Sequence, residues 1–289
     1  MILTSAPAML ACKHCGSPIA AEKRNCESCG EDNGYPNVRI ADSPQERTIL
    51  KQRLNDAEIS TAARRCKDVL DRFGTVILGS RAVISRSLAV VQDLIGNDRR
   101  SYTSYQRQLA SGARVAEENE FDRIRTQVEA ALFPNFHAEV VFGFLSLDHA
   151  PLGGYGAYSM VLKEDMISHR ATVFEENLVV LSKRLRLILS DPIPPGYRAK
   201  WEHRDILAKA KLHGELESGM SDSDFSRILV NDRGGTGDSD FIEVHIFGPI
   251  NRYTIDRVVG HLPKPREDRL IWRRLERQLK PLGISVETI

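Results

Sequence analysis

The stretch DSDFIEVHIFG, residues 238–248, alternates apolar and polar side chains as a β-strand does. A period of two places Ile242, Val244 and Ile246 on one face of this strand. The other face carries Glu243 and His245 between two phenylalanine rings, directly after the glycine-rich NDRGGTG. A carboxylate in such a place is suited to stabilise a cation or to accept a proton. The alternative is a half-exposed strand whose polar face meets only water.

The chain around this strand alternates between glycine-bounded strands and amphipathic helices. AEVVFGFLSL and AYSMVLK predict strands that the turn LGGYG separates. Helices are predicted over residues 178–188 and over RDILAKAKLHGEL. The basic REDRLIWRRLERQLKPLG predicts a further helix whose inward side chains are Leu270, Ile271, Leu275 and Leu279. Together these elements predict an α+β domain with an antiparallel-rich sheet over residues 136–289.

Residues 42–135 predict a mainly helical segment that packs on this domain. SPQE at residues 43–46 combines a serine N-cap, a first-turn proline and a capping box, and an apolar stripe follows until Gly74. Cys66 lies on that stripe, which indicates a buried structural thiol rather than a nucleophile. TVILGS predicts a short strand, RAVISRSLAVVQDLIG a second helix or a strand–helix junction, and EENEFDRIRTQVEAALF a third helix.

Four of the five cysteines form two C-x2-C pairs in the segment CKHCGSPIAAEKRNCESCG. A glycine follows each pair and permits the positive φ that a tight knuckle turn favours. Two such knuckles supply four thiolates, which suit a tetrahedral Zn2+ ion. The expected ligands are Cys12, Cys15, Cys26 and Cys29. His14 lies inside the first pair and is expected to face solvent.

The C-x2-C-G-x9-C-x2-C-G spacing resembles that of the short bacterial zinc-ribbon family. The resemblance implies a ribbon over residues 1–36 that folds only with its structural Zn2+. Four basic and four acidic side chains balance over residues 1–40. This balance favours a protein partner for the ribbon, although a nucleic-acid target stays open.

The composition of the 289-residue chain excludes several broad classes. Its formal net charge of +1 indicates no general affinity for nucleic acid, and the basic C-terminal helix is expected to be a solvated face, with a nucleic-acid groove as the alternative. No apolar run approaches the roughly 18 residues of a membrane span. Paired cysteines of this kind predict a metal-binding protein of the reducing cytoplasm rather than a disulfide scaffold.

The segments YGAYSMVLKEDMISHRATVFEEN and FIEVHIFGPINRYTIDRVV are similar in layout to ADP-ribosyltransferase-type toxin domains. The resemblance implies a mono-ADP-ribosyltransferase-like effector or toxin, with a role in bacterial defence, that uses NAD+ as a substrate to modify a macromolecule. It implies that Glu243 supports the ribosyl oxocarbenium ion as nicotinamide leaves. Tyr155 or Tyr158 would then stack on the nicotinamide, and His149 or Arg81 would hold the nucleotide.

Arg170 and Asn177, in SHRATVFEEN, are candidates to contact a phosphate or the ribose. The glutamates between them also complement the dipole of the helix that follows. One departure from the toxin pattern concerns the acceptor. Arginine-modifying members carry Glu or Gln two residues before the catalytic glutamate, and this chain has Phe241 there. Arginine is therefore a doubtful acceptor.

Two readings from other functional classes stay open. Asp232 or Asp240, together with Glu243 and His245, echoes the paired carboxylates that hold Mg2+ in metal-dependent nucleases. Alternatively, the chain is a non-enzymatic adaptor that binds a partner through the zinc ribbon and the helical segment. The toxin resemblance also leaves open an inhibitory partner protein.

Overall fold

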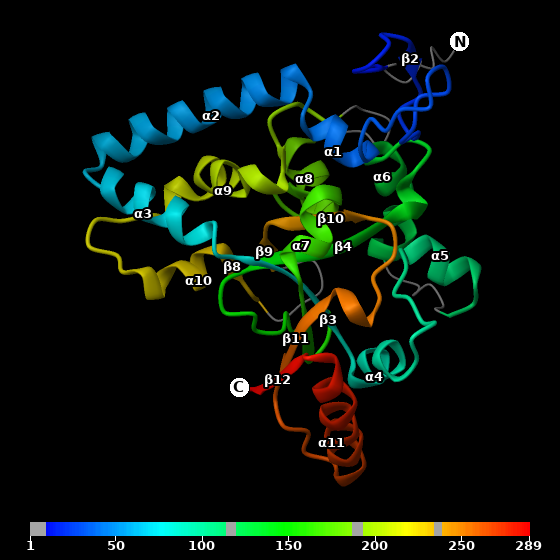
Figure 1. Ribbon diagram of the computed structural model, residues 1–289. Helices are drawn as coiled ribbons and strands as arrows, with labels where there is room; N and C mark the ends of the chain where they lie inside the picture. Colours follow the sequence, from blue (N-terminus) through cyan, green and yellow to red (C-terminus); the bar gives the residue numbers. More distant parts are fainter. Residues whose placement is uncertain (1–9, 114–119, 187–192, 234–238) are drawn as a thin grey trace.

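The strand around Glu243 becomes β10 (Glu243–Phe247), an interior strand of the large sheet in this computed structural model (Figure 1). The structure describes residues 10–113, 120–186, 193–233 and 239–289. Within these ranges the sheet has eight strands in the order β12-β11-β5-β3-β4-β10-β6-β7. Neighbouring strands are antiparallel except β11 and β12, which are parallel. The predicted α+β class with an antiparallel-rich sheet is confirmed.

The other strands of this sheet are β3 (Arg81–Arg86), β4 (Val140–Ser146), β5 (Tyr158–Leu162), β6 (Ala171–Phe174), β7 (Arg198–Lys200), β11 (Ile255–Gly260) and β12 (Ser285–Thr288). Two short pairs stand apart, β1 (Leu10–Ala11) with β2 (Pro18–Ile19), and β8 (Val230–Asn231) with β9 (Asp240–Phe241).

The helices are α1 (Pro36–Ala41), α2 (Pro44–Ala63), α3 (Lys67–Ile77), α4 (Leu88–Gly96), α5 (Tyr105–Ala110), α6 (Glu120–Leu132), α7 (Glu164–Ile167), α8 (Leu178–Leu185), α9 (Arg204–Leu212), α10 (Phe225–Leu229) and α11 (Arg266–Leu279). Short 3-10 turns cover His137–Glu139, Ser168–Arg170, Trp201–His203, His213–Glu215, Asp222–Asp224, Arg252–Thr254 and Lys280–Leu282.

Strand β3 comes from the segment that was expected to be mainly helical. It lies between β4 and β5 and pairs with both. RAVISRSLAVVQDLIG is thus a strand–helix junction, the second of the two forms that its sequence allowed. The strand expected at TVILGS is wrong, because residues 75–77 complete α3 and bury Ile77 on the same stripe as Phe73. Residues 81–86 therefore belong to the same sheet as the C-terminal strands.

The helix expected from residue 43 to Gly74 begins as predicted but is divided in two. Ser43 accepts a hydrogen bond from the Glu46 backbone N–H at 3.3 Å, as a serine N-cap should. The chain then turns at Arg65, whose φ of 58° lies in the left-handed region. Cys66 is fully buried at this corner, as predicted, and its thiol donates to the Leu216 carbonyl. The corner lets α3 fold back beneath α2 beside α9 (Figure 1).

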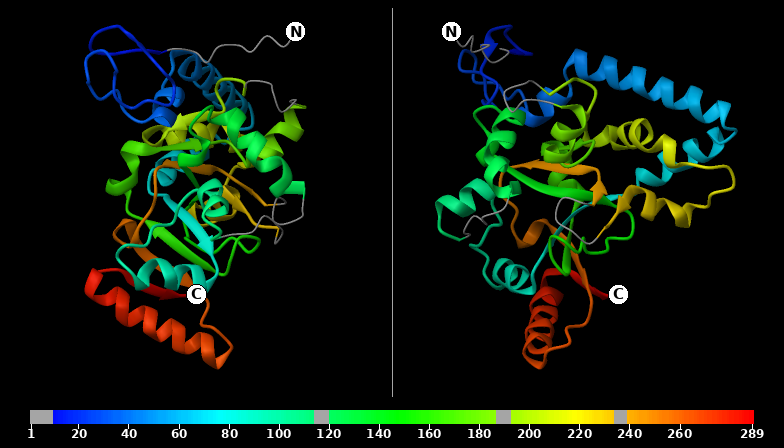
Figure 2. Two further views of the ribbon diagram at one scale, coloured as in Figure 1. Left: turned by 90° about the vertical axis from the view of Figure 1, so that its right-hand side faces the viewer. Right: turned by 180° about the vertical axis from the view of Figure 1, so that it is seen from behind.

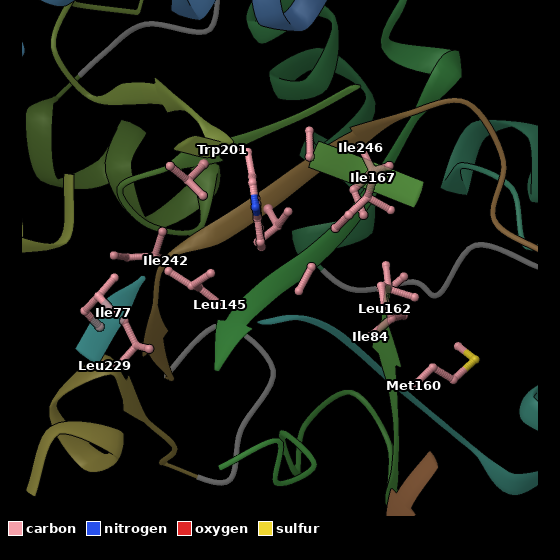
Figure 3. Packing of buried hydrophobic residues seen from close by; sticks show 14 of the residues in the cluster. Ile77, Ile84, Leu145, Met160, Leu162, Ile167, Trp201, Leu229, Ile242 and Ile246 are labelled. Atoms are coloured by element: carbon pink, nitrogen blue, oxygen red, sulfur yellow. The ribbon is translucent and has the colours of Figure 1, made fainter. Parts of the chain in front are cut away.

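Both faces of β10 are buried. Ile242, Val244 and Ile246 enter the largest apolar cluster, where Figure 3 shows Ile242 and Ile246 near Leu145 and Trp201. On the opposite face, side chains from α6, α8 and the residues after α6 form a second cluster. The alternation predicted from sequence is confirmed, but the polar face does not meet bulk water. Glu243 is 6% exposed and His245 is 2% exposed.

Helix α11 lies at the far end of the molecule from the cysteine-rich N-terminal region (Figures 1 and 2). It packs against α4 and buries Trp272, Leu275 and Leu279. The expectation that Leu270 faces inward is wrong, because Leu270 is 57% exposed and Trp272 fills the inward position. In the part of the chain that is described, no helix is long and apolar enough to cross a membrane.

Candidate functional site

The four paired cysteines converge, as the spacing predicts. Their sulfur atoms all lie within 4.8 Å of one another. The Sγ atoms of Cys12 and Cys29 are 3.7 Å apart, as are those of Cys15 and Cys26. Gly16 and Gly30 have φ values of 74° and 76°, so a side chain there would strain each knuckle turn. The four sulfurs form a cluster that can hold a metal ion, whereas His14 is exposed outside it.

A short seam joins this cysteine cluster to the central sheet. The ring of Tyr35 packs on Phe247 of β10 and on His169, with centroid distances of 5.4 and 5.6 Å. Asn37 of α1 donates to the backbone carbonyl of His245 at 3.1 Å and to that of Arg170 at 3.0 Å. The seam therefore ends on the backbone of the strand that carries Glu243.

A cavity of about 430 Å³ opens at the other end of this strand, where Glu243 lies. Its volume is in the range of pockets that bind small molecules. Side chains from β3, β4, β10, α6 and α8 and from the turn before β5 line it. Its charged, phenolic and amide lining includes Arg86, Tyr102, Arg125, Glu129, Tyr155, Asn177 and Glu243.

Glu243 lies at the base of this cavity, held by strand pairing on both sides. Its backbone partners are Phe144 of β4 and Phe174 of β6. One carboxylate oxygen, Oε1, accepts a hydrogen bond from Asn177 Nδ2 at 3.2 Å. The other, Oε2, lies 3.0 Å from His245 Nε2. The carboxylate is thus fixed in one orientation by two side chains and by a strand in the interior of the sheet.

His245 contacts Glu243 but does not line the cavity. Three phenylalanine rings surround the imidazole, with centroid distances of 5.0 Å to Phe133, 4.8 Å to Phe142 and 5.3 Å to Phe174. Such an enclosure prevents the imidazole from turning away from the carboxylate. His245 therefore orients Glu243 and has no direct access to a bound molecule.

Asn177 is oriented by its second role as the N-cap of α8. Its Oδ1 accepts from the Val179 backbone N–H at 3.0 Å, which leaves Nδ2 to face Glu243. The neighbouring Glu175 and Glu176 point elsewhere, because both form ion pairs with Arg184. The segment FEEN thus brings only its asparagine into the cavity.

An aromatic wall faces the carboxylate. The ring of Tyr155 meets the ring of Phe241 edge-on at 5.9 Å, and Phe241 meets Phe144 at the same distance. Burial, together with the negative charge of Glu243, raises the pKa of Tyr155 to about 12. The phenol therefore stays protonated across the physiological pH range. Its position depends on Gly156, whose φ of 143° and close approach to the Arg86 backbone admit no side chain.

Two arginines form the cationic part of the wall. Arg86 donates through Nε to the Tyr102 hydroxyl at 2.5 Å and stacks over that ring. Arg125 donates through Nε to Glu129 at 2.5 Å and lies 4.2 Å from the centroid of Tyr105. Arg86 also donates through Nη1 to the Ser85 carbonyl at 2.6 Å. Each guanidinium has five N–H donors, so these bonds occupy only part of its capacity. Two positive charges thus line a cavity that also contains two carboxylates.

The cavity brings together three of the residues selected from the sequence, Tyr155, Asn177 and Glu243. Arg81 begins β3 and pairs with Glu164 at 3.0 Å, while Arg86 at the other end of the strand reaches the cavity. Tyr158 is buried against Trp272 of α11, with a centroid distance of 5.2 Å. The structure does not bring Arg81 or Tyr158 into contact with Glu243.

His149 and Arg170 also lie outside the cavity. His149 follows β4 with a φ of 62°, and burial together with the nearby charge of Arg257 lowers its pKa. Arg170 donates to the backbone carbonyls of Phe247 and Pro249 and so holds the end of β10. Its guanidinium thus donates hydrogen bonds to backbone carbonyls, which indicates a structural role.

Among the cavity residues that were not selected from the sequence are Arg86, Tyr102, Arg125 and Glu129. Arg125 and Glu129 are four residues apart on α6, a spacing that is common on exposed helices and therefore a weak signal. Arg86 ends a strand whose pairing with both β4 and β5 has no signature in the local pattern. Tyr102 lies in a loop, and its position depends on its bridge to Ile250.

The carboxylates named for the nuclease alternative do not gather around Glu243. Asp240 is ion-paired with Lys211, and Asp232 accepts from the Ser239 hydroxyl and the Gly153 backbone. Among the described residues, the four cysteines are the one group of three or more potential ligands that can hold a metal. Residues 234–238 of the glycine-rich loop lie outside the described ranges.

Comparison with known proteins assigns no family to this arrangement. No protein-family model matches the chain, and no curated protein matches it.

Proposed function

We propose that the chain is an ADP-ribosyltransferase-like enzyme that binds NAD+ in the cavity at Glu243. The observation that carries the proposal is the buried carboxylate of Glu243, which Asn177 and His245 hold at the base of a cavity with aromatic and cationic walls. A fixed negative charge in a place with little water stabilises a developing cation far better than an exposed one. The ribosyl group of NAD+ develops such a positive charge as nicotinamide leaves.

In the proposed reaction the bond between the ribose C1′ and the nicotinamide nitrogen breaks, and its electron pair leaves with nicotinamide. The carboxylate of Glu243 supports the ribosyl oxocarbenium ion, and a nucleophile of the acceptor then bonds to C1′ and loses its proton. Asn177 and His245 keep both carboxylate oxygens in place during this step. A carboxylate that is already oriented needs no rearrangement as charge develops.

The walls suit the two ends of the substrate. The rings of Tyr155 and Phe241 offer an apolar face for nicotinamide, and the guanidinium groups of Arg86 and Arg125 offer donors for the pyrophosphate. Phe241 occupies the position of the second carboxylate in arginine-modifying enzymes of this type. The acceptor that we propose is therefore a macromolecular group other than arginine.

We further propose that the cysteine cluster holds a structural Zn2+ in the reducing cytoplasm and that the ribbon contacts a target or partner. Four thiolates suit tetrahedral Zn2+, and they stay reduced in that compartment. The donor set leaves no position open for a substrate, so the metal has no part in the reaction at Glu243.

The test is incubation of the purified chain with NAD+ carrying a label on its adenylate part, with and without a cell lysate. We expect release of nicotinamide and transfer of the label to a macromolecule. Glu243→Gln keeps the shape of the side chain but removes its charge, and we expect it to lower the rate by about a hundredfold or more. Binding of NAD+, measured by calorimetry, should survive this substitution.

The matched control is Glu287→Gln, a second glutamate on a strand, which pairs with Arg257 at the edge of the sheet. It should leave nicotinamide release unchanged. Absence of nicotinamide release by the wild-type chain, or equal activity in Glu243→Gln, would rule out the proposal. Loss of function only on replacement of the cysteines would favour the adaptor reading instead.

A further inference from the structure

The outward face of α11 carries a row of positive side chains, which we call the cationic stripe. Its members are Arg266, Arg269, Arg273, Arg277 and Lys280. Their separations of three, four, four and three residues place them on one side of a helix. All five are exposed, and the exposed Leu270 lies among them.

From Arg266 to Lys280 the chain carries six basic and three acidic side chains, a net charge of +3, and Glu276 lies within one turn of the stripe. Within the described ranges, none of its five members forms an ion pair with a carboxylate. Arg269 instead donates to the backbone carbonyl of Lys264, and Arg277 to that of Arg273. Arginines on other exposed helices are paired, for example Arg47 with Asp42 and Arg72 with Asp222. Like charges three and four residues apart repel one another, so the stripe costs helix stability.

The apolar side of α11 is already occupied. Trp272 packs on Tyr158, and Leu275 and Leu279 are fully buried in the main apolar cluster. A basic amphipathic helix binds a membrane by burying its apolar face among the lipids. That face is not available here, so the stripe acts through its charge alone.

We propose that the cationic stripe binds the phosphate backbone of a nucleic acid. A 14-residue helix is about 21 Å long, and each strand of a DNA duplex presents a phosphate about every 3.4 Å along its axis. Steps of three and four residues separate the charges by about 4.5 to 6 Å along the axis. Such a regular row suits a regular polyanion better than the irregular charges of a protein surface. The rest of the chain is nearly neutral, which confines the contact to α11.

Nucleic-acid binding of this kind is independent of the proposed reaction with NAD+. It reads no base sequence, and it weakens steeply with salt because each contact releases counterions. The inward face of α11 approaches the strand that carries Arg86, since Trp272 packs on Tyr158 and Tyr158 pairs with Arg86, whereas the stripe lies on the outward face.

The test is fluorescence anisotropy of the full chain with a labelled DNA duplex of about 24 base pairs and mixed sequence, without NAD+, over about 50 to 250 mM salt. The variant neutralises three members of the stripe, Arg266→Gln, Arg273→Gln and Arg277→Gln. We expect affinity at low salt to fall by at least about tenfold. The slope of log affinity against log salt should shrink by about one for each lost contact.

The matched control neutralises three exposed cations of α2 and α3, with Arg47→Gln, Lys51→Gln and Lys67→Gln, for the same change in net charge. Circular dichroism shows whether each variant stays folded, and glutamine preserves helix propensity. Retained affinity in the control supports the proposal. Equal loss in both variants, no loss in either, or wild-type binding to anionic lipid vesicles but not to DNA would overturn it.

Discussion

The cysteine cluster and the Glu243 cavity are two places in the described part of the chain where potential ligands or reactive groups converge, and they are assembled differently. The four cysteines lie between residues 12 and 29, and two tight turns bring them together. The cavity draws on residues from Ile84 to Glu243, which only the pairing of strands brings close.

Because of this difference, the two sites should be sensitive to different perturbations. The cluster has little apolar support, with Cys12, Ile19 and Cys26 as its small buried core, so we predict that its order depends on binding of the proposed Zn2+. The cavity rests on the large sheet and on apolar clusters on both sides of it. Its geometry should therefore respond to substitutions in the packing rather than to metal.

The largest expected effect is the loss of the metal. Cys26→Ser removes one of four thiolates, and metal binding supplies roughly 10 kcal/mol or more of the folding free energy of such sites. We expect metal content to fall from one ion per chain and hydrogen-exchange protection to disappear over residues 10–33. The central sheet should keep its own unfolding transition, because the seam at Tyr35 and Asn37 is small.

His14→Ala is the control for this substitution, since His14 lies in the same knuckle but outside the cluster. It should retain the metal. If removal of the metal unfolds the whole chain in one step, the two regions are not separable in the way described above.

The next largest effect concerns the backbone of the cavity. A Cβ atom on Gly156 would lie 2.3 Å from the Arg86 backbone, at a φ that other residues rarely adopt. We expect Gly156→Ala to lower the free energy of unfolding by about 3 kcal/mol, as strain and overpacking combine. Urea unfolding measures this, with Gly214→Ala as the control because nothing lies near its Cβ position. Equal stability of the two variants would contradict the close approach.

A smaller effect follows from the buried phenol of Tyr155. Its pKa is raised to about 12 in the folded chain, against about 10 in the unfolded chain. The folded state then binds more protons between these values, so this contribution to stability is complete below pH 10 and is lost as pH rises toward 12. We expect a loss of up to about 3 kcal/mol that Tyr155→Phe abolishes.

Urea unfolding at pH 8 and near pH 11 tests this for the wild type and for Tyr155→Phe. Tyr253→Phe serves as the control, because the ring of Tyr253 is 47% exposed. The alkaline loss should persist in Tyr253→Phe. An identical pH dependence in all three proteins would show that the phenol of Tyr155 titrates normally.

The smallest effect is at the seam between the two regions. Asn37→Ala removes the donor that serves the carbonyls of His245 and Arg170. We expect a cost of about 1 kcal/mol, because the asparagine Oδ1 has no partner in the described part of the chain and its burial offsets part of the gain. Hydrogen exchange in α1 should accelerate, while Asn55→Ala on the exposed side of α2 should leave it unchanged.

Local patterns predicted much of the fold. The cap at Ser43, the corner thiol Cys66 and the two-sided alternation of β10 all depend on residues near one another in the chain. For the inward face of α11, the sequence predicted Leu270 where the structure has Trp272. Leu270 and Trp272 are both compatible with an apolar stripe, and contact with Tyr158 decides between them.

Such local patterns do not predict which strands pair when they are far apart in the chain. Nothing in RAVISR indicates that β3 enters between β4 and β5, yet this insertion decides that Arg86, rather than Arg81, reaches the cavity. In the same way Tyr155, in the turn before β5, faces the cavity while Tyr158 on the strand faces α11.

By itself, the sequence determined the cysteine cluster, because the spacing of two knuckles sets the positions of four sulfurs through turns of a few residues. It also determined which side chains share a face of β10, because the period of a strand is a local property. Only the tertiary structure decided that this face is buried, that His245 and Asn177 contact the Glu243 carboxylate, and that Tyr155 lines the same cavity. These relations depend on the order of strands and on the helices that cover them. Burial and hydrogen-bond geometry arise from packing between segments far apart in the chain.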